Sequence, residues 1–168
     1  TTTTSLLTWI LQCAGLAPAY LIGGIAKNLG QGCSLRPSRH VVIEGDEYDT
    51  AFFDKRSKFL HYLPELVIVN NLEFDHADIF KDLDEIKASF RRLMNIVPEN
   101  GIVLVNADDE HAIDIAHASR APVLSVGFGE NAARRIEDAV YGNGAKFRLL
   151  ETEFTLQIPG EFNVRNAA

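Results

Sequence analysis

The sequence predicts an α/β fold, namely a mostly parallel sheet flanked by helices, with a small antiparallel β unit near the C-terminus. Short apolar runs alternate with amphipathic helical segments over most of the 168 residues, which is typical of a parallel sheet covered on both faces. In the last third, polar and apolar residues alternate, and Asn143-Gly144 is a strong signal for a hairpin turn. The hydrophobic content of 46% is enough for the core of one ordinary domain.

The first half of the chain is expected to form one helix and three short strands. Residues 5–15 have apolar side chains at helical spacing, with Gly15 as a stop, Trp9 in the core and hydroxyls of the preceding threonines as N-caps. Continuous apolar runs predict strands, two of them buried, and a fourth segment, 59–62, is a weaker candidate. The strands are predicted at 20–22, 41–43 and 66–69.

The second half is expected to continue the alternation of strand and helix. Residues 83–97 place their apolar side chains on one helix face, and Pro98 to Gly101 ends that helix. A second helix is predicted at 109–119, where Asp108 and Asp109 are better explained as caps than as metal ligands. The predicted strands of this half are 102–105, 123–126, 134–141, 145–150 and 152–158.

Charge and composition exclude several classes of function. The formal net charge of −7 disfavours nucleic acid as the main partner, because phosphate binding needs a basic face. No apolar run is long enough to cross a membrane, and the apolar stretch 6–19 lacks the basic segment of a signal peptide. Cys13 and Cys33 lack metal-finger spacing and are expected to be reduced thiols. We therefore expect a cytoplasmic protein.

Two predicted strands end in groups that suit a divalent metal ion. Glu44 begins an acidic segment after the strand 41–43, and Asp75-His76 follow the strand 66–69. Parallel sheets place ligand sites at the carboxyl ends of their strands. Carboxylate and imidazole together suit Mg²⁺ or Mn²⁺, and Asp75 is suited to orient the imidazole. The alternative is that both segments are simply solvated acidic loops.

The run Thr1-Thr2-Thr3-Thr4-Ser5 leads directly into the first predicted helix, as the residues after a P-loop lysine do. A phosphate-binding loop needs glycines, whose backbone N–H groups point at the phosphates, and a lysine. This sequence has neither in front of the run. On these residues alone, a threonine-rich helix start without further function is the simpler interpretation.

Several segments, in this order along the chain, resemble the central domain of the Mur ligase family. They are the threonine run, Leu21 to Gly24, Glu44 to Asp49, Asn71 to His76, Asn106 to Asp109 and Gly160 to Ala168. The resemblance extends over essentially the whole chain. It implies a P-loop-type sheet and an ATP-dependent ligase that forms an amide bond. A carboxylate would attack the γ-phosphate of ATP to form an acyl phosphate, and an amine would then displace phosphate.

The resemblance also implies roles for individual residues. Thr1 would be a hydroxyl ligand of Mg²⁺, and Thr2 would lie beside the phosphates of ATP. Glu44 and His76 would be the catalytic metal ligands. Asn163 and Asn166 would lie near the adenine. Many family members have histidine where Phe162 stands, so this ring is expected to stack on the base.

The segment 46–59 is similar to the family branch that joins the murein tripeptide L-alanyl-γ-D-glutamyl-meso-diaminopimelate to UDP-N-acetylmuramate. The branch that adds L-alanine usually has serine where Tyr48 stands. The alanine-adding activity and a catalytically inert nucleotide-binding module remain the alternatives. Lys55, Arg56 and Lys58 are candidates for binding substrate anions, or they form a solvated face.

Family members have a UDP-sugar-binding domain before the central domain and a peptide-binding domain after it. We expect residues 1–168 to be a single central domain truncated at both ends, and the chain alone not to be a working ligase.

Overall fold

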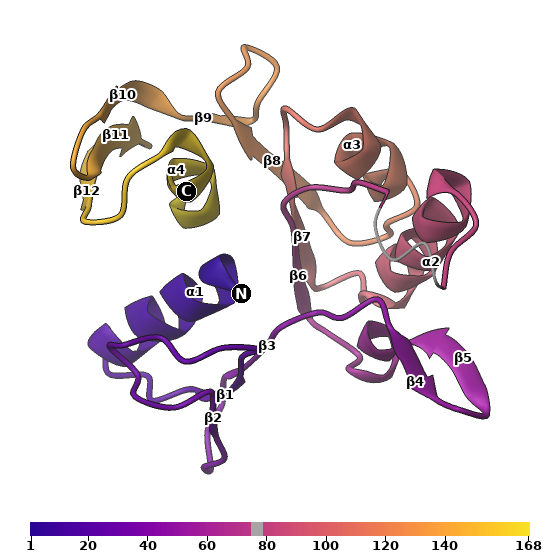
Figure 1. Cartoon of the computed structure of the whole chain (residues 1–168). Helices are drawn as coiled ribbons and strands as arrows, with labels where there is room; N and C mark the ends of the chain where they lie inside the picture. Colours follow the sequence, from indigo (N-terminus) through magenta and orange to yellow (C-terminus); the bar gives the residue numbers. More distant parts are fainter. Residues whose placement is uncertain (75–78) are drawn as a thin grey trace. The chain divides into compact units, whose positions relative to one another are not determined.

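The computed structural model describes residues 1–74 and 79–168 (Figure 1). The chain divides into two compact units, one made of residues 1–45 with Ala167 and one made of residues 46–166 with Ala168. Each unit contains its own sheet structure, so the two are described separately. The alternation of strand and helix that the sequence predicts is present, and the α/β class is confirmed.

The first unit joins one helix to a three-stranded sheet. Helix α1 (Thr2–Cys13) leads to strands β1 (Ala19–Leu21), β2 (Cys33–Ser34) and β3 (Val41–Ile43), in the sheet order β2-β1-β3. β1 and β3 are parallel, with Ala19 opposite Val41 and Leu21 opposite Ile43. The residues that follow β1 and β3 therefore leave the same edge of the sheet, which places Gly23 close to Glu44.

Gly15 ends α1 as predicted. Its φ of +76° is the left-handed conformation that glycine adopts without steric cost. Its N–H donates to the carbonyl of Gln12, and the N–H of Leu16 donates to the carbonyl of Leu11. This pair of hydrogen bonds is the Schellman motif, which satisfies the last carbonyls of the helix.

Three expectations for the first unit were wrong. The N-cap Thr1 makes no side-chain capping hydrogen bond, and the threonines after it already lie inside the helix. The side chain of Trp9 is 36% exposed instead of lying in the core. In β3 only Val42 is buried, and Val41 is 63% exposed, so this strand is not buried on both faces in its own unit. The core of this unit is small and consists of Tyr20, Ile22 and Val42, with partly buried leucines around them.

The second unit is built on a four-stranded parallel sheet in the order β6-β7-β8-β9. The strands are β6 (Leu66–Val69), β7 (Ile102–Asn106), β8 (Val123–Gly127) and β9 (Arg134–Arg135). The first three lie within one residue of the predicted ranges. β9 pairs with β8 in parallel, so the start of the predicted strand 134–141 belongs to this sheet and not to the antiparallel unit.

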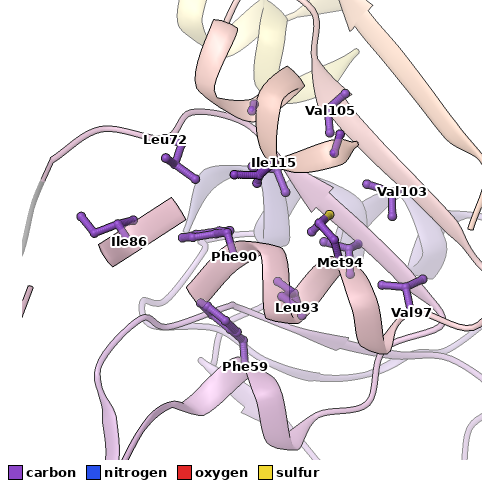
Figure 2. Packing of buried hydrophobic residues seen from close by; sticks show 14 of the residues in the cluster. Phe59, Leu72, Ile86, Phe90, Leu93, Met94, Val97, Val103, Val105 and Ile115 are labelled. Atoms are coloured by element: carbon purple, nitrogen blue, oxygen red, sulfur yellow. The ribbon is translucent and has the colours of Figure 1, made fainter. Parts of the chain in front are cut away.

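Two helices cover one face of the parallel sheet with apolar side chains. Helix α2 (Leu83–Ile96) has the predicted apolar face, and Asp82 caps it by accepting the N–H of Glu85. Helix α3 (Glu110–Ala116) is shorter than predicted at both ends. Figure 2 shows Phe90, Leu93 and Met94 of α2 close to the valines of β7 and to Ile115 of α3. This cluster is larger than the core of the first unit.

A hairpin that was not predicted from the sequence precedes β6. Strands β4 (Asp49–Ala51) and β5 (Asp54–Ser57) pair in antiparallel fashion, and a 3₁₀ turn, η1 (Lys58–His61), replaces the weak strand predicted at 59–62. The hairpin turn is Phe52-Phe53, and neither residue has a positive φ. The sequence therefore lacks the glycine or asparagine that usually reveals a two-residue hairpin.

The antiparallel unit near the C-terminus is present as predicted. Strands β10 (Glu137–Tyr141), β11 (Ala145–Leu149) and β12 (Thr152–Leu156) form a sheet in that order. Gly144 stands in the predicted turn, and any side chain there would collide with the carbonyl oxygen of Leu156. Helix α4 (Glu161–Ala167) follows the sheet. Among the helices of the described residues, none combines the length and the apolar character that a membrane span requires.

Candidate functional site

Glu44 is the centre of a hydrogen-bonded cluster in the first unit. It directly follows β3, and its backbone N–H continues the pairing with β1 by donating to the carbonyl of Leu21 (3.0 Å). The hydroxyl Oγ1 of Thr1 donates to Oε1 of Glu44 (2.6 Å), and the α-amino group of Thr1 lies 2.9 Å from the same oxygen. The backbone N–H of Gly23 donates to Oε2 (2.7 Å). Both carboxylate oxygens are therefore held in place.

These contacts keep the carboxyl of Glu44 ionised. Partial burial acts to raise its pKa, but the hydrogen bonds from the Thr1 hydroxyl, the α-amino group and the Gly23 N–H together outweigh burial. The pKa of Glu44 therefore lies below its ordinary value of 4.5. The side chain remains 24% exposed, so the negative charge is accessible from solvent.

Gly23 and Gly24 allow this close approach of the backbone. A Cβ atom on Gly23 would lie 3.2 Å from Oε2 of Glu44, and one on Gly24 would lie 3.2 Å from Cγ2 of Thr1. Both distances are tighter than ordinary van der Waals contacts, so the two glycines leave room for the carboxylate and the threonine. Leu21 to Gly24 resembles a family segment, but its contact with Glu44 was not predicted from the sequence.

The donor set around Glu44 fits a hard divalent cation. Magnesium prefers oxygen ligands and is usually held by one or two carboxylates, with the other positions taken by water and phosphate oxygens. The ionised carboxylate of Glu44 and the hydroxyl of Thr1 are such oxygens, and they lie within hydrogen-bonding distance of each other. Within residues 1–74 and 79–168, no group of three or more His, Cys, Asp or Glu side chains is arranged to hold a metal ion.

Thr2, Asp75 and His76 complete the predicted set of metal and phosphate ligands. His76 and Asp75 lie outside the described residues, so a metal centre shared by Glu44 and His76 stays a prediction. Thr2 is exposed in the first turn of α1, immediately after the residue that contacts Glu44. Its predicted position beside phosphates is untested.

The pKa shift of Glu44 predicts a pH-dependent contribution to stability. Because the pKa is lower in the folded state, the charged contacts stabilise the fold above pH 4.5 and lose this effect as the pH falls through the folded-state value. Because the Glu44 side chain is still partly exposed, solvent screening limits the effect to about 1 kcal/mol or less. Urea unfolding of the wild type and Glu44→Gln should therefore differ at neutral pH and converge in acid. A difference that is independent of pH would contradict the assignment.

Asn163 and Asn166 lie on α4 in the second unit. Asn163 is buried, and its Nδ2 donates to the carbonyl of Pro159 (2.6 Å), so this amide holds the turn before the helix. Oδ1 of Asn166 accepts from Nδ2 of Asn70 (3.1 Å), which follows β6. Phe162, expected to stack on a base, is 67% exposed on the same helix. The structure thus places Asn166 at the carboxyl end of β6.

Asp108 does not cap α3, contrary to the prediction. Asp109 alone caps this helix, accepting the N–H groups of His111 (2.8 Å) and Ala112 (3.0 Å). The carboxylate of Asp108 instead accepts the N–H groups of Phe128 (2.9 Å) and Gly129 (2.8 Å) beyond the end of β8. Gly127 and Gly129 leave room for this carboxylate, and no local pattern around Asp108 indicated that contact.

The basic residues of β5 and of the start of η1 are each paired with a nearby acidic residue. Nζ of Lys55 lies 2.7 Å from Asp49, and Nζ of Lys58 lies 2.9 Å from Asp46. Arg56 donates from Nε and Nη2 to the two oxygens of Asp54. The contact with Asp46 raises the pKa of Lys58, and that with Arg56 lowers the pKa of Asp54. All three basic side chains remain exposed.

Comparisons of the sequence and of the structure with known proteins identify the same family. The family model described as "Mur ligase middle domain" matches residues 1–168. A relative from Haemophilus influenzae, named UDP-N-acetylmuramate--L-alanyl-gamma-D-glutamyl-meso-2,6-diaminoheptandioate ligase, is 54% identical over 112 residues, which are 67% of this chain and 25% of the relative. The UDP-N-acetylmuramate--L-alanine ligase of Variovorax paradoxus is 34% identical over 177 residues, covering 99% of this chain and 35% of the relative.

A solved structure is similar over nearly the whole chain. It is the UDP-N-acetylmuramate:L-alanyl-gamma-D-glutamyl-meso-diaminopimelate ligase from Neisseria meningitides, with a TM-score of 0.87 and 38% sequence identity. The match covers 99% of this chain and 55% of that structure. The chain thus spans between a quarter and about half of the lengths of these relatives.

Proposed function

This chain belongs to the Mur ligase family, and we propose that it is the ATP-binding central domain of a ligase that joins a murein tripeptide to UDP-N-acetylmuramate. The observation that carries the proposal is the carboxylate of Glu44, held by Thr1 and Gly23 at the carboxyl ends of the parallel strands β1 and β3. The identity of 54% to a relative named for tripeptide ligation supports this choice of substrate. In this proposal residues 1–168 are one domain of a longer enzyme, with domains for the UDP-sugar and the peptide outside it.

The chemical difficulty of this reaction is that a carboxylate must approach a triphosphate, and both are anions. A bound Mg²⁺ would neutralise part of this charge. Glu44 and Thr1 would hold the ion, with His76 as a further ligand, and Thr2 would lie beside the phosphates. Since Gly23 and Thr1 already fix both oxygens of Glu44, little reorganisation of this side chain would be needed on binding. A metal-dependent site also reconciles phosphate chemistry with a net charge of −7.

Two further groups of residues would contact the substrates. Asn163 and Asn166 would lie near the adenine, and the exposed ring of Phe162 would be available for stacking. Lys55, Arg56 and Lys58 would bind substrate carboxylates or the nucleotide diphosphate. The acidic partners of these basic residues make substrate binding by them less favourable, because each ion pair would have to be exchanged for a contact with substrate.

The proposal is tested with the intact enzyme supplied with ATP, Mg²⁺, UDP-N-acetylmuramate and the tripeptide. ADP and phosphate should form only when both substrates are present, and removal of Mg²⁺ by a chelator should stop the reaction because the anions are then not neutralised. Release of phosphate and formation of the UDP-linked peptide are measured together. ATP hydrolysis without any amide product would contradict the proposal and favour a nucleotide-binding module without ligase chemistry.

Ligation of free L-alanine is the second candidate function, because the alignment with the alanine-adding relative covers 99% of the chain. Parallel assays with L-alanine and with the tripeptide separate the two activities. A larger kcat/KM for the tripeptide is expected. A preference for L-alanine would assign this chain to the other branch of the family.

A further inference from the structure

We propose that the ion pair between Asp108 and Arg165 is a positioning device, which sets α4 so that Asn163 and Asn166 meet the nucleotide base. This inference rests on the proposed function, because it assigns α4 to nucleotide binding. It concerns two residues that are expected to touch neither the metal nor the reacting atoms. It is carried by contacts that all lie within the second unit.

Asp108 occupies a site built to hold a carboxylate. Its Oδ2 accepts the N–H of Phe128, its Oδ1 accepts the N–H of Gly129, and its own N–H donates to Oδ1 of Asn106 (3.0 Å). A Cβ atom on Gly127 or on Gly129 would lie 2.9 Å from the Asp108 carboxylate, closer than real Cβ contacts come. The glycines therefore let the loop after β8 close around this side chain.

Arg165 connects this carboxylate to α4. Its Nη1 donates to Oδ2 of Asp108 (2.7 Å), and its Nη2 donates to Oε1 of Glu161 (2.7 Å) one helical turn earlier. The guanidinium also lies over the ring of Phe128, 4.9 Å from the ring centroid. One side chain thus contacts the end of β7, the loop after β8 and the first turn of α4.

The start of α4 has no side chain of its own to hold it. Its N-cap is Gly160, and no side-chain capping hydrogen bond is made there. Arg165 stands between Asn163 and Asn166 in the sequence, and Asn166 makes its own contact with Asn70. The rotation of α4 about its axis, and with it the direction of both asparagines, is therefore fixed by these two links to the strand ends.

Steady-state kinetics of the intact ligase test this inference. Arg165→Gln is expected to raise KM for ATP by about tenfold, the factor that corresponds to about 1.4 kcal/mol, with the KM for the tripeptide unchanged. Arg165→Lys should restore part of the loss, since an ammonium still pairs with Asp108 but cannot contact Glu161 in the same fork geometry. The matched control is Arg148→Gln, which removes an arginine paired with Glu137 and Asp138 on the antiparallel sheet. It should leave both KM values unchanged.

A second variant tests the same ion pair through Asp108 instead of Arg165. Gly129→Ala should displace the Asp108 carboxylate and reproduce the selective rise in KM for ATP, whereas Gly142→Ala, with open space around the added Cβ, should not. Wild-type turnover with the tripeptide is measured in the same series, so failure of the proposed function is recognised separately. An unchanged KM for ATP in Arg165→Gln, or equal losses for ATP and the tripeptide, overturns the positioning role even if the wild type is an active ligase.

Discussion

Replacing Glu44 with alanine in the intact ligase is expected to lower kcat by about a thousandfold or more, equivalent to roughly 4 kcal/mol of transition-state stabilisation. The carboxylate is the acidic member of its cluster, and both of its oxygens accept hydrogen bonds, from Thr1 and from Gly23. The Thr1 hydroxyl and the Gly23 N–H both stabilise the negative charge that this carboxylate carries at neutral pH. Alanine removes this charge together with the proposed metal ligand, and no other acidic group in the cluster replaces it.

The measurement is kcat and KM for ATP over a range of Mg²⁺ concentrations, with far-UV circular dichroism to verify that the fold is kept. Glu99→Ala is the matched control, because it removes an exposed glutamate from the turn between α2 and β7. Glu44→Gln retains the size of the side chain and should be nearly as impaired, since the charge is what the metal requires. Turnover of Glu44→Ala within a few-fold of the wild type would exclude Glu44 from the site.

The position of Glu44 could be predicted from the sequence because strand ends follow a simple rule. A continuous apolar run identified β3, and the carboxyl ends of parallel strands are where α/β proteins bind ligands. The residues that contact Glu44 could not be predicted from such a rule. Thr1 was selected only through the family resemblance, and the contact of Gly23 depends on the parallel register of β1 and β3, which no local pattern encodes.

Other features could not be predicted because tertiary contacts override local signals. Asp108 and Asp109 look alike beside a helix start, yet one caps α3 and the other accepts N–H groups from the loop after β8. The β4–β5 hairpin was missed because its turn, Phe52-Phe53, has no turn-forming residue. Trp9 has a large apolar side chain of the kind usually found in a core. In the first unit, however, α1 packs on the core through other residues, and Trp9 remains partly exposed.

Replacing Phe90 with alanine should reduce the free energy of unfolding by about 3–5 kcal/mol. Phe90 is 9% exposed on the apolar face of α2, and its ring centroid lies 5.1 Å from that of Phe59 (Figure 2). Interiors are close-packed, so the alanine would leave a cavity between α2 and the turn η1 in addition to losing buried apolar area. Urea unfolding followed by far-UV circular dichroism gives the free energy of each variant.

The chain contains its own control for this prediction. Phe53→Ala removes the same side chain at the tip of the β4–β5 hairpin, where the ring is 91% exposed, and should change the free energy of unfolding by no more than about 0.5 kcal/mol. The single tryptophan, Trp9, belongs to the first unit, so its fluorescence reports on that unit while circular dichroism reports on both. Coincident transitions mean that the two units unfold together, which is required for a single free energy to be defined. A loss below 1 kcal/mol for Phe90→Ala would show that this cluster does not determine the stability of the second unit, because about 3 kcal/mol is the least that a buried phenylalanine normally contributes.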